Sequence, residues 1–232
     1  MGRTAANDIA ASRSLIVALF AAALSLAGTL AQGQALAVKA GTYGVGLELE
    51  YGLNSHFGAR LQLDGGSISH SINKTSVDYN GHIRFENALA LADWHPSAGS
   101  WRMSAGLVYN NNRIDLTGVP SSGTFTINHN AYPAASVGSL RGTLDFNKVA
   151  PYLGTGWGIS PRGAGFFGSL DLGVLWQPQH LSLTATCGAA IQGTPACNQL
   201  QTDTATEQTK LQDQTHVFRW WPVLQVGIGW RF

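Results

Sequence analysis

Apolar residues occupy every second position of the last stretch of the chain, from Phe218 to Phe232. The positions between them carry small, polar or mixed side chains, and a period of two predicts a β-strand with one apolar face. Trp220 and Trp230 lie near the two ends of that face, about 33 Å apart along the strand and roughly 23 Å apart after a tilt of ~45°. This spacing matches the aromatic girdles that bound the apolar belt of an outer-membrane barrel.

The same alternation recurs upstream and predicts an all-β chain. Seven segments follow it clearly, over residues 43–51, 57–64, 77–91, 101–112, 140–158, 170–176 and 218–232. A barrel of this class needs an even number of strands, so residues 34–41 are interpreted as an eighth strand, joined to the next by a tight turn near 41–44. The change of apolar parity near Asn147 is interpreted as a β-bulge.

Short and long connections alternate between these segments. Short turns are expected at 53–56, 94–99 and 160–163, because Pro, Gly and polar residues interrupt the alternation there. Long polar loops are expected at 65–76, 117–139 and 177–215, with a small hairpin inside 124–132 and weak helical character over 196–214. The expected fold is an eight-stranded antiparallel transmembrane β-barrel with short periplasmic turns and long extracellular loops.

The N-terminal segment reads as a signal peptide. Arg3 and Arg13 supply a basic region, and the apolar stretch 15–26 is too short to span a bilayer. The expected domains are a signal peptide over residues 1–31, with cleavage after residue 37 as the alternative, and an outer-membrane barrel over residues 32–232. We therefore expect the protein in the outer membrane of a Gram-negative bacterium. A net charge of +1 gives no case for a nucleic-acid partner.

Charged residues recur on the polar faces of the expected strands. The interior of an eight-stranded barrel is just wide enough for side chains to fill, so these charges are expected to meet in the lumen. Two interpretations stay open, a buried ion-pair network that packs the lumen and a path for a small charged solute. The residues expected to line the lumen or such a path are Glu48, Glu50, Arg60, Asp64, Asp78, His82, Arg84, Glu86, Arg102 and Asp171.

Two further groups of residues complete the expected sites. Cys187 and Cys197 lie on an exported segment and are expected to form a disulfide. The aromatic girdles are expected to include Tyr43, Tyr51, Trp101, Trp220, Trp230 and Phe232. The seven histidines are scattered, and Ser69-His70-Ser71 is the nearest hint of a catalytic group, so we expect no enzyme, no metal and no cofactor.

Several short motifs resemble a known family. They are Ala-Gly-Thr-Tyr-Gly at 40–44, Val-Ala-Pro-Tyr-Leu-Gly at 149–154, and Gln-Pro-Gln-His-Leu-Ser-Leu-Thr at 177–184. With the barrel pattern from about Val38 to Phe232, they resemble the small eight-stranded outer-membrane proteins of the CarO type, described as ornithine or basic amino-acid uptake porins. The resemblance implies outer-membrane lipid as the surroundings. The terminal aromatic resembles the signal that the barrel-assembly machinery reads on the last strand.

Three functions follow from these observations. The first is a narrow porin-like channel that takes up small solutes such as basic amino acids. The second is a closed barrel whose extracellular loops bind a partner. The third is a lipid-acting barrel enzyme, which a Ser-His-acid cluster on the rim would support.

Overall fold

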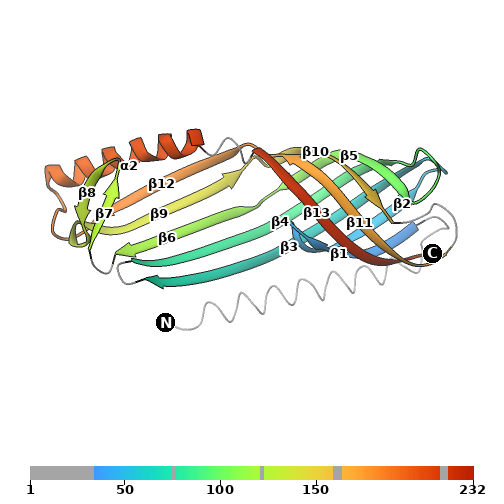
Figure 1. Cartoon of the computed structure of the whole chain (residues 1–232), viewed down its shortest axis with the longest axis horizontal. Helices are drawn as coiled ribbons and strands as arrows, with labels where there is room; N and C mark the ends of the chain where they lie inside the picture. Colours follow the sequence, from blue (N-terminus) through green and yellow to red (C-terminus); the bar gives the residue numbers. More distant parts are fainter. Residues whose placement is uncertain (1–33, 75–76, 121–122, 159–163, 215–218) are drawn as a thin grey trace.

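The structure is a computed structural model and describes residues 34–74, 77–120, 123–158, 164–214 and 219–232. The predicted signal peptide and the short turn predicted at 160–163 lie outside these ranges. Figure 1 shows an elongated molecule with the strands along its length. The elements are β1 (Gln34–Gly41), β2 (Gly44–Gly52), β3 (Phe57–Lys74), β4 (Val77–Trp94), β5 (Trp101–Asn110), β6 (Arg113–Pro120), β7 (Thr124–Ile127), β8 (Asn130–Pro133), η1 (Ala134–Ser136), β9 (Val137–Phe146), β10 (Val149–Trp157), β11 (Gly165–Trp176), β12 (Gln179–Cys187), α2 (Pro195–Gln214) and β13 (Trp220–Arg231).

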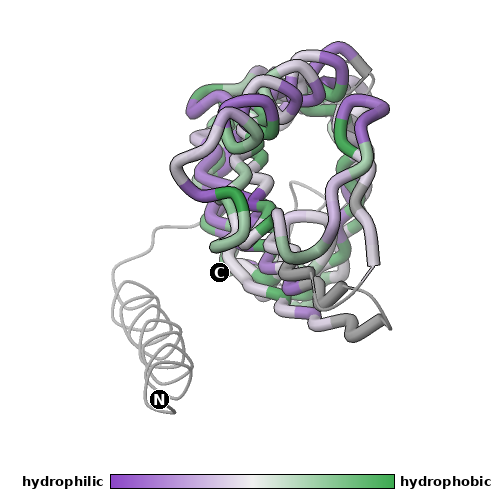
Figure 2. The backbone as a smooth tube through the Cα atoms, turned by 90° about the vertical axis from the view of Figure 1, so that its left-hand side faces the viewer, coloured by the Kyte–Doolittle hydropathy of each residue, from purple (hydrophilic) through white to green (hydrophobic). Residues whose placement is uncertain are grey.

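Eight of the described strands close into an antiparallel barrel. Their order is β4-β3-β2-β1-β13-β11-β10-β5, and β5 returns to β4 to complete the ring. The first and last strands meet, since Leu36 of β1 lies opposite Trp230 of β13 and opposite Leu49 of β2. The predicted strand over 34–41 and the predicted eight-stranded fold are therefore confirmed. The view along the long axis shows the strands arranged as a ring (Figure 2).

A second, open sheet extends the barrel beyond one end. Five strands form it, in the order β12-β9-β6-β4-β3, and we call it the extension. β3 and β4 run without interruption from the barrel into the extension, while β6, β9 and β12 continue β5, β10 and β11 after a break of two residues. Figure 1 shows the extension opposite the end that holds the C-terminus. The prediction of loops at 65–76, 117–139 and 177–215 is wrong wherever these strands cover those segments.

The two faces of the sheet exchange polarity where the barrel becomes the extension. On β3, Leu61 and Leu63 point outward with 60% and 51% of their surface exposed, and Asp64 points inward and is buried. Farther along, Ser67 takes the outward side and Ile68 the inward side, because alternation continues without a register shift. The outward change from apolar to polar recurs on neighbouring strands from Ala88 to Glu86, Tyr109 to Asn111, and Val149 to Asn147.

This exchange marks the edge of the lipid-facing belt, since lipid requires apolar side chains and water favours polar ones. It also explains the change of parity near Asn147, because β9 and β10 keep one register against β6 and β5 on that side. Against β11 and β12, the register shifts by two residues between Phe146 and Tyr152, so an irregularity does lie where the bulge was predicted. The inner face of the extension is apolar and includes Ile68, Ile83, Phe85, Ile114, Leu116, Leu140, Leu144, Leu181 and Leu183.

The helix α2 covers the outer edge strand of the extension. The side-chain oxygens of Gln212 and Gln208 accept hydrogen bonds from the backbone N–H groups of Leu181 (2.6 Å) and Leu183 (3.0 Å) in β12. The amide of Gln212 also donates to the carbonyl of Gln179 at 2.9 Å. Side chains of a polar helix thus hydrogen-bond to the edge backbone groups of β12 that a further strand would otherwise pair with. Within the described ranges, no helix has the length and apolar character needed to cross a membrane.

Candidate functional site

Arg60 is the centre of a buried ion-pair network inside the barrel. Its guanidinium contacts Glu48 of β2 at 2.8 Å, Asp93 of β4 at 2.6 Å and Asp171 of β11 at 3.2 Å. The Arg60 side chain is 1% exposed, so protein carboxylates rather than water solvate its charge. Alternation on β3 places Arg60 on the inner face, one inward position below Gln62.

Two further cations extend this network across the lumen. Arg102 of β5 donates to Asp171 at 2.7 Å and lies 4.0 Å from Glu50 of β2. Lys39 of β1 lies 3.3 Å from Glu48 and also pairs with Asp171. Six of the eight barrel strands therefore meet through charged side chains. These ion pairs cross the lumen and join strands on opposite sides of the barrel.

An apolar layer shares the lumen with the ionic network. It comprises Tyr43, Leu89, Leu91, Val108, Ala150, Tyr152, Leu175 and Val223, with Trp221 packed against it. Tyr43, in the turn between β1 and β2, is fully buried among these side chains. Its predicted place in the aromatic girdle is wrong, because the tight turn directs the ring into the barrel instead of toward lipid.

Most of the predicted lumen residues lie in the barrel interior. Glu48, Glu50, Arg60, Arg102 and Asp171 belong to the network described above. Asp64 is buried beside them and accepts a hydrogen bond from Gln62 at 2.8 Å, and Gln62 in turn donates to Gln225 at 3.0 Å.

The predicted lumen position is wrong for the residues of β4 that lie in the extension. Arg84 and Glu86 form an ion pair of 3.2 Å on the outer face of the extension, with side chains 51% and 48% exposed. His82 is exposed on the same face. The faces were reversed because three alanines of β4, at 88, 90 and 92, face lipid and so resemble a packed inner face. The side chain of Asp78 lies outside the described part of the structure.

Two network residues were missed in the sequence analysis. Lys39 is fully buried, and its signal was present as a lone charge on the small-residue face of the strand Gln34–Gly41. Asp93, buried to 1% exposure, precedes Trp94, and its proximity to the turn concealed its role as a partner of Arg60.

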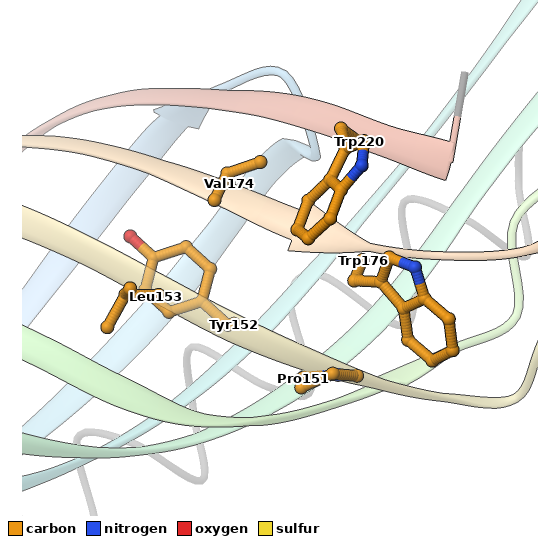
Figure 3. Close-up of a pocket in the computed structure, with 6 residues that line it drawn as sticks. All are labelled: Pro151, Tyr152, Leu153, Val174, Trp176 and Trp220. Atoms are coloured by element: carbon orange, nitrogen blue, oxygen red, sulfur yellow. The ribbon is translucent and has the colours of Figure 1, made fainter. Parts of the chain in front are cut away.

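The outer surface carries the remaining predicted girdle residues. Tyr51, Trp101, Trp220 and Trp230 are all exposed by 38% or more, and the terminal Phe232 is half-buried. Trp220 lies opposite Trp176, which the sequence analysis missed. Figure 3 shows these two rings with Pro151, Leu153 and Val174 around a notch of about 300 Å³. The notch faces outward from the barrel wall, so lipid chains are its natural neighbours.

A Ser-His pair lies on the outer face of the extension, but it lacks the acid of a catalytic triad. Ser69 Oγ and His82 Nδ1 are 2.8 Å apart, and Asp115 of β6 lies opposite His82 in the ladder. Asp115 instead accepts from Thr143 at 2.9 Å and pairs with Arg113 at 3.7 Å. Across the described residues, no group of three or more His, Cys, Asp or Glu side chains is placed to hold a metal.

The far end of the extension is fastened by a disulfide and a buried carboxylate. Cys187 at the end of β12 is bonded to Cys197 near the start of α2. Asp203 of α2 accepts hydrogen bonds from Tyr132 of β8 and from Asn130 at 2.7 Å. The Tyr132 hydroxyl, together with neighbouring amides, lowers the pKa of Asp203 to about 2.

Solved structures with this fold are known. CarO of Acinetobacter baumannii matches with a TM-score of 0.56 and 22% identity, over 85% of this chain and 97% of its own. CarO2 of the same species matches with a TM-score of 0.57 and 22% identity, over 87% of this chain and 99% of its own. Ail, the attachment invasion locus protein of Yersinia pestis, covers 87% of this chain and 100% of its own with 9% identity, and its TM-score of 0.37 is too low to argue from.

No family model and no curated protein matches the chain. The similarity to the two A. baumannii structures confirms the fold that the sequence motifs indicated. Together with the apolar outer belt, this fold makes the chain a small barrel of the outer-membrane type.

Proposed function

We propose that this chain, which has the fold of the CarO barrels, is a closed transmembrane anchor whose extension binds a partner outside the cell. The short turn at 53–56 lies at the end opposite the extension, and outer-membrane barrels keep their short turns in the periplasm. This orientation places the extension on the extracellular side. The observation that carries the proposal is the filled lumen.

The charged side chains in the lumen are out of reach of bulk water. Lys39 and Arg102 have no exposed surface, and Arg60 has 2%. Opening a path past Arg60 would separate it from three carboxylates, and an uncompensated buried charge costs about 3–5 kcal/mol. A large penalty of this kind favours a lumen that stays shut.

Uptake of small cationic solutes is the second candidate function. The observation in its favour is the excess of acid, because four carboxylates surround three cations in the network, namely Glu48, Glu50, Asp93 and Asp171 around Lys39, Arg60 and Arg102. A lysine-sized cation would find complementary charge there if the network rearranged. CarO-type proteins, as the sequence resemblance implies, are associated with this class of solute.

Planar-bilayer recording distinguishes the two candidates. The closed anchor predicts conductance at the background of an empty bilayer, with no current carried by lysine or ornithine. Single-channel steps that basic amino acids reduce competitively would overturn the closed anchor and support uptake. The exposed pair variant Arg84→Ala is the matched control, because it alters a charge outside the lumen.

A further inference from the structure

The two edges of the extension are treated differently by the fold. The β12 edge is covered by α2, whose glutamines bond to its backbone and whose start is tied down by the disulfide. The other edge belongs to β3. Its neighbour β2 begins at Gly44, and the last pair between them is Val45 with Gly65. Beyond Gly65, no described strand pairs with this side of β3.

The orientation of the β3 backbone shows which groups the free edge presents. The carbonyl of Phe57 accepts from Leu53 on the β2 side, and the carbonyl of His56 accepts from His95 on the β4 side. Backbone groups of successive residues point to opposite sides of a strand, so odd-numbered residues face the β2 side throughout β3. The backbone N–H and C=O groups of Ser67, Ser69 and Ser71 therefore point in the plane of the sheet toward the free edge of β3.

Along residues 66–71 of this edge none of the usual protections is present, and the first charged side chain of fixed sign is Lys74 at the end of β3. Natural edge strands are shortened, bulged, charged or interrupted by proline, whereas residues 66–71 contain no proline or charged residue other than the ionisable His70, and show no register shift. Ile68 beside the edge is 59% exposed on the inner face, and Leu116 farther in is 53% exposed. An uncovered edge next to exposed apolar side chains is a template for another strand.

We propose that the free edge of β3, over residues 66–74, binds an extended peptide segment of a partner by strand addition. This inference rests on the proposed function and names the class of partner. The added strand would continue the established β2–β3 ladder past Gly65, end-on to the β1–β2 turn. Its residues would alternate, apolar beside Ile68 on the inner face and small and polar beside Ser67, Ser69 and Ser71 on the outer face.

A second copy of this chain in the same membrane fits this edge poorly. Two copies related by an axis along the membrane normal would both carry β3 in the same direction, and their edges would meet as parallel strands. The same rotation brings the apolar inner face of one copy beside the polar outer face of the other. A continuous amphipathic sheet requires like faces side by side, so a separate peptide of matching alternation is favoured.

The test uses the refolded full-length barrel in detergent and a fluorescent peptide of about nine residues, the length of the free edge, that alternates threonine and valine between terminal lysines. Ser69→Pro removes the backbone N–H that faces the free edge and leaves the β4 ladder intact, because that ladder uses even-numbered residues. Ser69→Ala is the matched control, since it keeps the N–H and removes only the hydroxyl.

Fluorescence anisotropy is expected to show saturable binding to wild type and to Ser69→Ala, and binding at least about tenfold weaker to Ser69→Pro. If Ser69→Pro does not assemble, Ser71→Pro carries the same test nearer the end of β3. Equal affinity for the proline and alanine variants, or no saturable binding to wild type at millimolar peptide, would overturn the proposal. A conducting wild type would instead overturn the closed anchor and leave the binding result to stand by itself.

Discussion

Replacing Arg60 by methionine tests the central claim about the lumen. The substitution keeps much of the side-chain volume and removes a guanidinium held by three carboxylates at 2.6–3.2 Å. Glu48 retains Lys39, and Asp171 retains Lys39 and Arg102. The loss therefore falls on one residue, Asp93, which keeps only the hydroxyl of Ser104 among its described partners.

Removing one partner of a buried pair typically costs about 3–5 kcal/mol, and we expect Arg60→Met to lower the free energy of unfolding by this amount. Adding Asp93→Asn should restore about 1–3 kcal/mol, because the neutral amide can hydrogen-bond to Ser104 without a buried charge. Urea titration in lipid vesicles, followed by tryptophan fluorescence and by heat-modifiability on gels, measures both values. The exposed pair variant Arg84→Ala is expected to change stability by about 0–1 kcal/mol.

Two results would refute this reasoning. One is a double variant no more stable than Arg60→Met, because Asp93 would then not carry the unpaired charge. The other is an Arg84→Ala variant as unstable as Arg60→Met, which would mean that the assignment of inner and outer faces on β4 is wrong.

Three other predictions concern the extension. Cys197→Ser should destabilise the attachment of α2 by about 2–3 kcal/mol and speed proteolysis of the helix, while heat-modifiability of the barrel stays unchanged. The Tyr132 hydroxyl lowers the pKa of Asp203 to about 2, so the ionised Asp203 stabilises the fold fully above about pH 4, and this stabilisation is lost as pH falls through 2. Hydrogen exchange in β8 of the wild type should therefore rise over that pH window, and the Asp203→Asn variant should not show this acid transition. Replacing both Gln208 and Gln212 by leucine should leave the β12 edge unsatisfied and cause concentration-dependent association, which light scattering detects; a monodisperse variant would contradict the capping role.

The sequence predicted the barrel well because lipid imposes one rule on every spanning strand. Leu61 and Leu63 must face outward, and their alternation with Gln62 can be recognised without knowledge of the fold. The strand over 34–41 followed from the need for an even number of strands. The extension escaped prediction because its outer face lies in water, where Ser67 and Ser69 resemble loop residues.

The lumen was predicted only in part, because alternation separates two faces without saying which one points inward. On β3 the charged face is the inner one, as Arg60 shows, and the prediction for β4 applied the same parity. There the inner face carries Leu89 and Leu91, which join the apolar layer. Tyr43 could not be placed from local pattern because a turn, and not a strand, sets the direction of its side chain.

The exchange of polarity between the barrel and the extension has a consequence for how deeply the protein sits in the bilayer. In the barrel, up to Leu63, the outward side chains of β3 are apolar and suit hydrocarbon, whereas Ser67 in the extension is polar and suits water. Sliding the molecule along the membrane normal in either direction would place polar groups in lipid or apolar groups in water on four neighbouring strands at once. A slip of one strand by a single residue would reverse both of its halves together. Immersion depth and strand register are therefore fixed by the same boundary, and a change in bilayer thickness should be met by the lipid rather than by the protein.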